Sequence, residues 1–74
     1  MKLTGEQVIK MLLALGEGER VLVDGVDWTS IEDKFAVPAD SLGALAAEGD
    51  ATVFARREDL DNHFDAGSSY EVSR

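Results

Sequence analysis

The strongest structural signal in the chain is RVLVDGVDW, residues 20–28. Apolar and polar residues alternate on both sides of Asp24-Gly25, a dipeptide that accepts positive φ at both positions and suits a two-residue hairpin turn. The register that follows from this turn pairs Val23 with Val26, Val21 with Trp28 and Leu22 with Asp27. Because the three valines and the tryptophan then share one face, the segment is predicted to form a β-hairpin that continues to Ile31.

A helix is predicted upstream of the hairpin. Thr4 and Gln7 have the spacing of a capping box, in which each side chain bonds to the backbone amide of the other residue. Gly16 supplies a residue that commonly ends helices, so the helix is expected from about Gly5 to Leu15. One face carries apolar residues at helical spacing, namely Val8, Met11, Leu12 and Leu15.

Ile9 and Leu13 widen this apolar face. Two interpretations are open. In one, the two residues form a self-association seam and the protein is a homodimer, which would help a small chain without disulfides to stay folded. In the other, the helix lies under a loop or under the C-terminal segment.

Further elements are predicted downstream of the hairpin. Ser30 can weakly cap a short helical turn that carries Ile31 and Phe35 and that Pro38 ends. A helix capped at residue 40 or 41 is expected to run through Ala47. The remaining predicted elements are a strand at Ala51–Arg56, a helix at Glu58–Phe64, and at 66–74 either an edge strand or a flexible tail.

The predicted fold is therefore a single α+β domain, residues 1–74, with helices around a small three-stranded sheet. The order is N-terminal helix, β-hairpin, short helical segment, second helix, third strand and short C-terminal helix. The predicted core consists of Val8, Leu12, Leu15, Val21, Val23, Trp28, Leu42, Leu45, Val53 and Leu60.

Composition limits the functions that the chain can perform. Fifteen acidic residues against seven basic ones give a net charge of −8, which repels phosphate backbones and anionic headgroups and attracts basic surfaces. Direct nucleic-acid binding and membrane binding are therefore not expected. The longest apolar run is far too short for a membrane span, and no signal peptide is evident, so a cytoplasmic protein is predicted.

Catalytic, metal and cofactor sites are also not expected. The chain has no cysteine and a single histidine, His63, without a nucleophile elbow to accompany it. Asp59 and His63 are spaced to share a helix face, but one imidazole and no thiolate are too few ligands for structural zinc. His63 is instead interpreted as a surface histidine beside carboxylates. The segments 16–19 and 24–27 lack the donors of phosphate-binding and calcium loops.

An acid-rich stretch in the second half of the chain is the remaining candidate site. It comprises Glu48, Asp50, Glu58, Asp59, Asp61 and Asp65. One interpretation is a solvated face that keeps a small protein dispersed. The other is an array of carboxylates that binds a lysine- and arginine-lined groove, the kind of surface that normally receives nucleic acid.

Residues 35–59 resemble the helix-turn-helix and wing of winged-helix or excisionase-like regulators. The resemblance rests on the apolar spacing of 35–53 and on the Arg56-Arg57 pair that would end the wing. It implies a transcriptional regulator that contacts DNA. However, the segment that would be the recognition helix, 39–48, contains no lysine or arginine and adds two acids, which is unfavourable for DNA.

The whole chain resembles, in its format, the small acidic cysteine-free inhibitors of phages and mobile elements, type I anti-CRISPR proteins above all. The shared features are a capped first helix, a hairpin that ends at Trp28 and an acid-rich second half. The resemblance implies a stoichiometric inhibitor that binds a CRISPR-Cas effector complex as a DNA mimic and blocks its target DNA. It also implies action in the host cytoplasm, without enzymatic activity or a cofactor.

Overall fold

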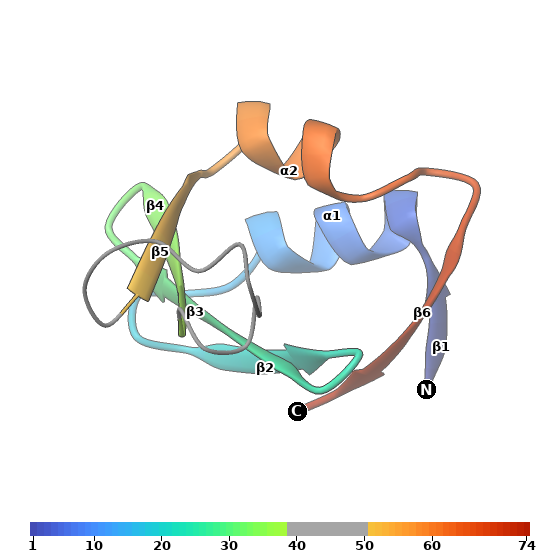
Figure 1. Ribbon diagram of the computed structural model, residues 1–74. Helices are drawn as coiled ribbons and strands as arrows, with labels where there is room; N and C mark the ends of the chain where they lie inside the picture. The colour runs from blue at the N-terminus through green and yellow to red at the C-terminus, as the bar shows by residue number, and fades with distance from the viewer. Residues whose placement is uncertain (39–50) are drawn as a thin grey trace.

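The computed structural model describes residues 1–38 and 51–74. Within them lie eight elements in the order β1 (Lys2–Thr4), α1 (Gly5–Leu13), β2 (Arg20–Val23), β3 (Val26–Ile31), β4 (Lys34–Pro38), β5 (Ala51–Ala55), α2 (Glu58–His63) and β6 (Ser69–Ser73). The strands form one sheet of order β1-β6-β2-β3-β4-β5, in which every neighbouring pair is antiparallel. Figure 1 shows the sheet curving around α1, with α2 above it.

The predicted α+β layout is therefore wrong. The protein is mostly antiparallel sheet with two short helices, and it lacks the predicted arrangement of helices around three strands. The winged-helix-like layout is wrong for the same reason. The predicted helix after Pro38 lies outside the described residues.

The hairpin and the start of the first helix are confirmed. β2 and β3 pair in the predicted register, and Asp24 and Gly25 both have positive φ (51° and 80°), as a two-residue turn of this type requires. The capping box is present: the Gln7 amide donates to Thr4 Oγ1 at 3.2 Å and the Thr4 amide donates to Gln7 Oε1 at 2.9 Å. Both signals involve only neighbouring residues.

The predicted helical turn at residues 30–35 is wrong, because this segment continues the sheet. Glu32 adopts φ 54° in a second tight turn, and Ile31 pairs with Lys34 across it. Phe35 and Val37 then alternate into the core, where both are fully buried. The alternation prevailed over the four-residue spacing of Ile31 and Phe35, because β4 is paired along both of its edges, with β3 on one and β5 on the other.

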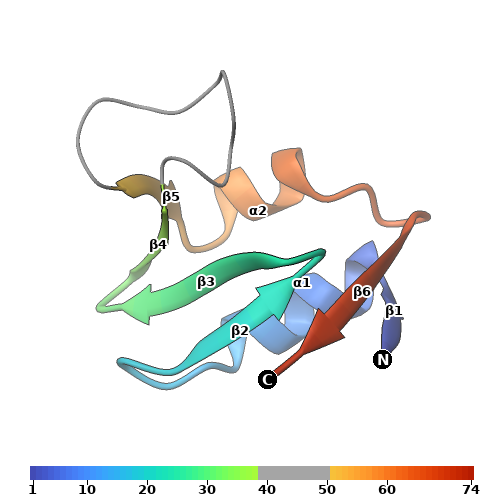
Figure 2. The same ribbon diagram turned by 60° about the horizontal axis from the view of Figure 1, so that its bottom comes forward.

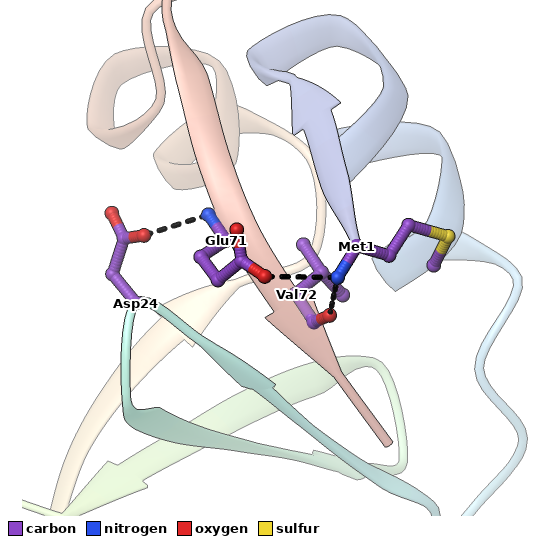
Figure 3. Close-up of polar contacts among 4 residues, drawn as sticks. All are labelled: Met1, Asp24, Glu71 and Val72. Atoms are coloured by element: carbon purple, nitrogen blue, oxygen red, sulfur yellow. Dashed lines mark hydrogen bonds and ion pairs between the residues drawn. The ribbon is translucent and has the colours of Figure 1, made fainter.

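The C-terminal segment is neither a tail nor an edge. β6 lies between β1 and β2, and Val72 is 1% exposed opposite Val23. Its position is reinforced by polar contacts (Figure 3): the Met1 ammonium contacts Glu71 Oε1 at 2.9 Å and the Val72 carbonyl at 3.1 Å. Asp24 Oδ1 accepts from the Glu71 amide at 2.7 Å, so the hairpin turn is bonded to the last strand as well.

The core lies between α1, α2 and the concave face of the sheet. Seven of the predicted core residues are buried there, but Val53 is 57% exposed, and Leu42 and Leu45 lie outside the described residues. The pairing of Phe35 with Phe54 turns Phe54 inward and Val53 outward, opposite Ala36. The core also contains residues that were not predicted, namely Ile9, Phe35, Val37, Phe64 and Val72.

Neither of the two helices in the described segments is long and apolar enough to cross a bilayer. α1 has nine residues and α2 has six. Figure 2 shows both helices on the same side of the β2–β3 hairpin.

Candidate functional site

Short helix α2 carries three of the predicted acidic site residues in its first turn: Glu58, Asp59 and Asp61. Negative side chains are favourable there because the unpaired amides of a helix start carry partial positive charge. Leu60 points from the same turn into the core and is fully buried. The acids are thus presented on a helix whose one buried residue is Leu60.

Asp59 has a structural task within this turn. Its Oδ2 accepts a hydrogen bond from the Ala55 amide at 2.8 Å, in a partly buried position. The bond joins the start of α2 to the end of β5. One of the two carboxylate oxygens of Asp59 is therefore used within the fold.

Glu58 and Asp61 are three residues apart and so lie on neighbouring positions of one helix face. Both are exposed, and we call this pair the α2 acidic face. Asp61 contacts Arg57 Nε at 3.2 Å, whereas the Glu58 side chain forms no hydrogen bond or ion pair within residues 1–38 and 51–74. Because an exposed ion pair of this kind contributes little, about 0–1 kcal/mol, Asp61 can exchange Arg57 for another cation.

Asp61 also borders a groove of about 280 Å³ between the two helices. Its rim carries charges of both signs, with Lys10 paired to Glu6 at 3.5 Å on α1 and Arg57 paired to Asp61 on α2. The floor is Ile9, which is 7% exposed. The balanced charges give this groove no preference for an anion or a cation.

Asp65, the fourth described acid of the predicted set, closes the loop after α2. Its carboxylate accepts from Ser68 Oγ at 2.7 Å and from the Gly67 amide at 3.4 Å. Glu48 and Asp50 lie outside the described residues. The structure thus brings Glu58 and Asp61 together on one face and places Asp59 and Asp65 in local structural bonds.

A second acidic group is formed by residues that are well separated in the sequence. Glu17 and Glu19 lie on the loop before β2, and Glu32 and Asp33 form the turn between β3 and β4. The Glu32 amide donates to Glu17 Oε2 at 2.8 Å and the Ser30 amide donates to the Glu19 carbonyl at 3.0 Å, which holds the two loops together. Sequence reasoning missed this group because its members are adjacent only after the strands pair.

Arg56 is half-buried, and its guanidinium makes contacts within the fold. Its guanidinium donates to Ser30 Oγ at 2.9 Å and to the Leu15 carbonyl at 2.9 Å, and its Cζ is 4.7 Å from the centre of the Phe35 ring. Ser30 is fully buried, so this arginine satisfies a polar group in the core. One of the two arginines that a DNA-binding wing would present is therefore occupied by an internal contact, whereas Arg57 is exposed and pairs with Asp61.

His63 is exposed, as expected for a surface histidine, but its neighbours include aromatic rings that the sequence did not predict. Its ring packs against three aromatic rings, at centroid distances of 5.3 Å to Trp28, 5.1 Å to Phe54 and 4.8 Å to Phe64. Partial burial lowers the pKa of His63 below its usual 6.5, because removing water disfavours the charged imidazolium. The imidazole is thus neutral near pH 7.

Next to this ring is a shallow depression of about 340 Å³ between β5 and α2, which we call the β5–α2 hollow. Its lining consists of Val53, Phe54, Asp59, Asn62 and His63. It combines an exposed valine and two rings with one carboxylate. Apart from the spacing of Asp59 and His63, no sequence pattern predicts this hollow, because the inward turn of Phe54 depends on the pairing of β5 with β4.

Ile9 and Leu13, the residues of the predicted self-association seam, belong to the apolar packing of α1. Ile9 is in the core and Leu13 is partly buried against it. This packing fits the interpretation in which other segments of the chain cover the helix. Within residues 1–38 and 51–74, no group of three histidine, cysteine or acidic side chains is arranged to hold a metal ion.

Comparison with known proteins adds no relative. The chain matches no protein-family model, no curated protein and no solved structure. Its function is therefore inferred from its own surface.

Proposed function

We propose that the protein is a stoichiometric inhibitor that binds a basic nucleic-acid-binding surface of another protein through the α2 acidic face. The observation that carries the proposal is the exposure of Glu58 and Asp61 on one face of a helix in a chain of net charge −8. A surface that normally receives phosphates is lined by lysine and arginine, and it would be occupied by carboxylates in their place.

The position of α2 supports this role. The helix is anchored by buried Leu60 and by the bond from the Ala55 amide to Asp59, so the acidic face is held in one orientation before a partner arrives. A preorganised face avoids the entropic cost of ordering its side chains and backbone on binding. The net negative charge would also steer the protein toward a cationic channel at long range.

The class of partner that we propose is a CRISPR-Cas effector complex, in keeping with the format that the chain shares with type I anti-CRISPR proteins. Such a complex holds its nucleic acid in a positively charged channel. An acidic protein in that channel would block target DNA in the host cytoplasm by occupancy alone, and this mode of action needs no catalytic group.

The first experiment is a binding assay with a purified type I effector complex. We expect the protein to bind at low salt and the affinity to fall as NaCl is raised, because exposed charges are screened. Target DNA should fail to shift the complex in a gel once the protein is bound. No binding at low salt, or binding that leaves DNA capture intact, would refute the proposal for this partner.

Single charge reversals test which face binds. Glu58→Lys and Asp61→Lys are each expected to weaken binding about tenfold or more, about 1.4 kcal/mol. The control is Asp33→Lys, which makes the same change on the exposed turn between β3 and β4. Equal losses in all three variants would show that binding depends only on net charge or on the second acidic group.

A further inference from the structure

We infer that the β5–α2 hollow receives an arginine side chain of the basic partner, an inference that rests on the proposed function and names the group that the surface recognises. The hollow borders α2 on the side of Asp59 and Asn62. These two residues directly follow Glu58 and Asp61 in the sequence, so the hollow lies beside the α2 acidic face. A partner that approaches Glu58 and Asp61 would bring its own side chains over this hollow.

The lining suits a long side chain with a flat cationic end. At about 340 Å³, the hollow is at the small end of the range for ligand pockets, roughly 300–1,000 Å³. Val53 is 57% exposed and provides an apolar surface for a methylene stem. The rings of Phe54 and His63 meet at 67° beside it, with centroids 5.1 Å apart, and can contact the edge or the face of a guanidinium.

Polar groups at the rim complete the match. The Asp59 carboxylate uses Oδ2 to bind the Ala55 amide and can accept a further hydrogen bond from a cation. Asn62, whose side-chain amide includes an oxygen acceptor, belongs to the same lining. Arginine fits better than lysine because its planar guanidinium stacks on rings and is more weakly hydrated than an ammonium group.

The fold already contains one contact of this kind. The guanidinium of Arg56 lies 4.7 Å from the Phe35 ring and donates to two oxygens. The inferred contact would repeat this combination of ring and oxygen acceptors at the surface, with a side chain supplied by the partner.

The charge state of His63 affects the inferred contact. A neutral imidazole does not repel a neighbouring cation, whereas a positively charged imidazolium in the same hollow does. Asp59, on the same helix, is the other titratable group of the lining, while the rings packed on His63 from β3, β5 and the end of α2 belong to Trp28, Phe54 and Phe64 and carry no charge. Acidification should therefore weaken arginine binding through His63.

The test uses the full chain and two synthetic peptides, nona-arginine and nona-lysine, with affinities measured by calorimetry at low salt. Nona-arginine is expected to bind at least about threefold more tightly than nona-lysine. Val53→Lys, which places a cation in the hollow, should weaken nona-arginine binding about fivefold or more. The matched control, Leu22→Lys, alters a 39% exposed strand residue away from the hollow and should weaken it less than twofold.

A third arm follows pH. Nona-arginine binding to the wild-type chain should weaken between pH 7.5 and 5.5, and His63→Gln should remove most of that change. Trp28 fluorescence of each variant serves as the check that it is folded, because the tryptophan is buried in the core.

The outcomes separate this inference from the proposed function. Equal losses for Val53→Lys and Leu22→Lys, or no preference for arginine, would overturn the hollow as the arginine site. Absence of any nona-arginine binding would overturn it as well. In each case, the effector assay with Glu58→Lys still decides the proposed function on its own.

Discussion

The two helices of this protein are stabilised in different ways. α1 has nine residues, begins with a capping box and carries apolar residues along its length. α2 has six residues, has no side-chain cap at Arg57, and depends on buried Leu60 and on the Asp59 contact with Ala55. The comparison shows that α2, the helix proposed to bind the partner, is stabilised by contacts with the rest of the fold and not by a side-chain cap of its own.

The largest effect should come from removing the anchor of α2. Leu60→Ala deletes a fully buried side chain and is expected to lower the free energy of unfolding by about 2–5 kcal/mol, a large share of the total for a small domain. Urea unfolding followed by Trp28 fluorescence would measure it. Leu22→Ala, at a 39% exposed leucine, is the control with an expected change within about 0.5 kcal/mol. A loss below about 1 kcal/mol for Leu60→Ala would mean that other contacts hold α2.

A smaller effect, of unexpected sign, should appear in α1. Helix propensity alone predicts that Gly5→Ala stabilises the protein by up to about 1 kcal/mol. In the fold, a Cβ on Gly5 would lie 2.0 Å from the Asp65 carbonyl oxygen, so we expect a loss of about 1–3 kcal/mol instead. Thermal unfolding monitored by circular dichroism would measure this change.

Gly67→Ala is the matched control for Gly5→Ala. A Cβ at Gly67 meets no atom within 4 Å, so its effect should be near zero or slightly stabilising. A stabilising Gly5→Ala would contradict the close packing of the helix start on the loop after α2. It would show that helix propensity alone governs the first turn of α1.

The smallest effect is a pH-dependent change in stability that comes from His63, a residue of α2. Because burial lowers the folded-state pKa of His63, the unfolded chain binds its proton first as pH falls below 6.5. The contribution of His63 to stability is complete above that pH and is lost as pH falls toward the folded-state pKa. The urea concentration at the midpoint of unfolding should decrease when the pH is lowered from 7.5 to 5.5, and this decrease should be smaller in His63→Gln. Identical pH dependence in both proteins would show that His63 is not desolvated.

Local signals were enough for part of the fold. The hairpin register and the capping box depend on residues within a few positions of one another, and both are confirmed. The segment 31–38 was predicted wrongly because its two patterns conflict and because glutamate at positive φ is an uncommon turn residue. Only pairing with β3 and β5 favours the strand.

The site was less predictable than the fold. The sequence pointed to acids near residue 60, and Glu58 and Asp61 do share a face, but the structural bonds of Asp59 and Asp65 depend on an amide of β5 and on the loop before β6. The β5–α2 hollow exists because Phe54 turns inward opposite Phe35 and leaves Val53 outside. In the isolated strand the two residues are equally suited to face the core.

The amino-acid sequence by itself determined the strong negative charge, which depends only on composition. It also determined the hairpin and the first turn of α1, which depend on contacts between near neighbours. Only the tertiary structure decided that residues 69–73 form an inner strand, that Arg56 is used in the core, and that His63 lies among aromatic rings. The reason is physical: each of these positions is set by partners distant in the sequence, and their free energy is gained only once the sheet has closed around α1.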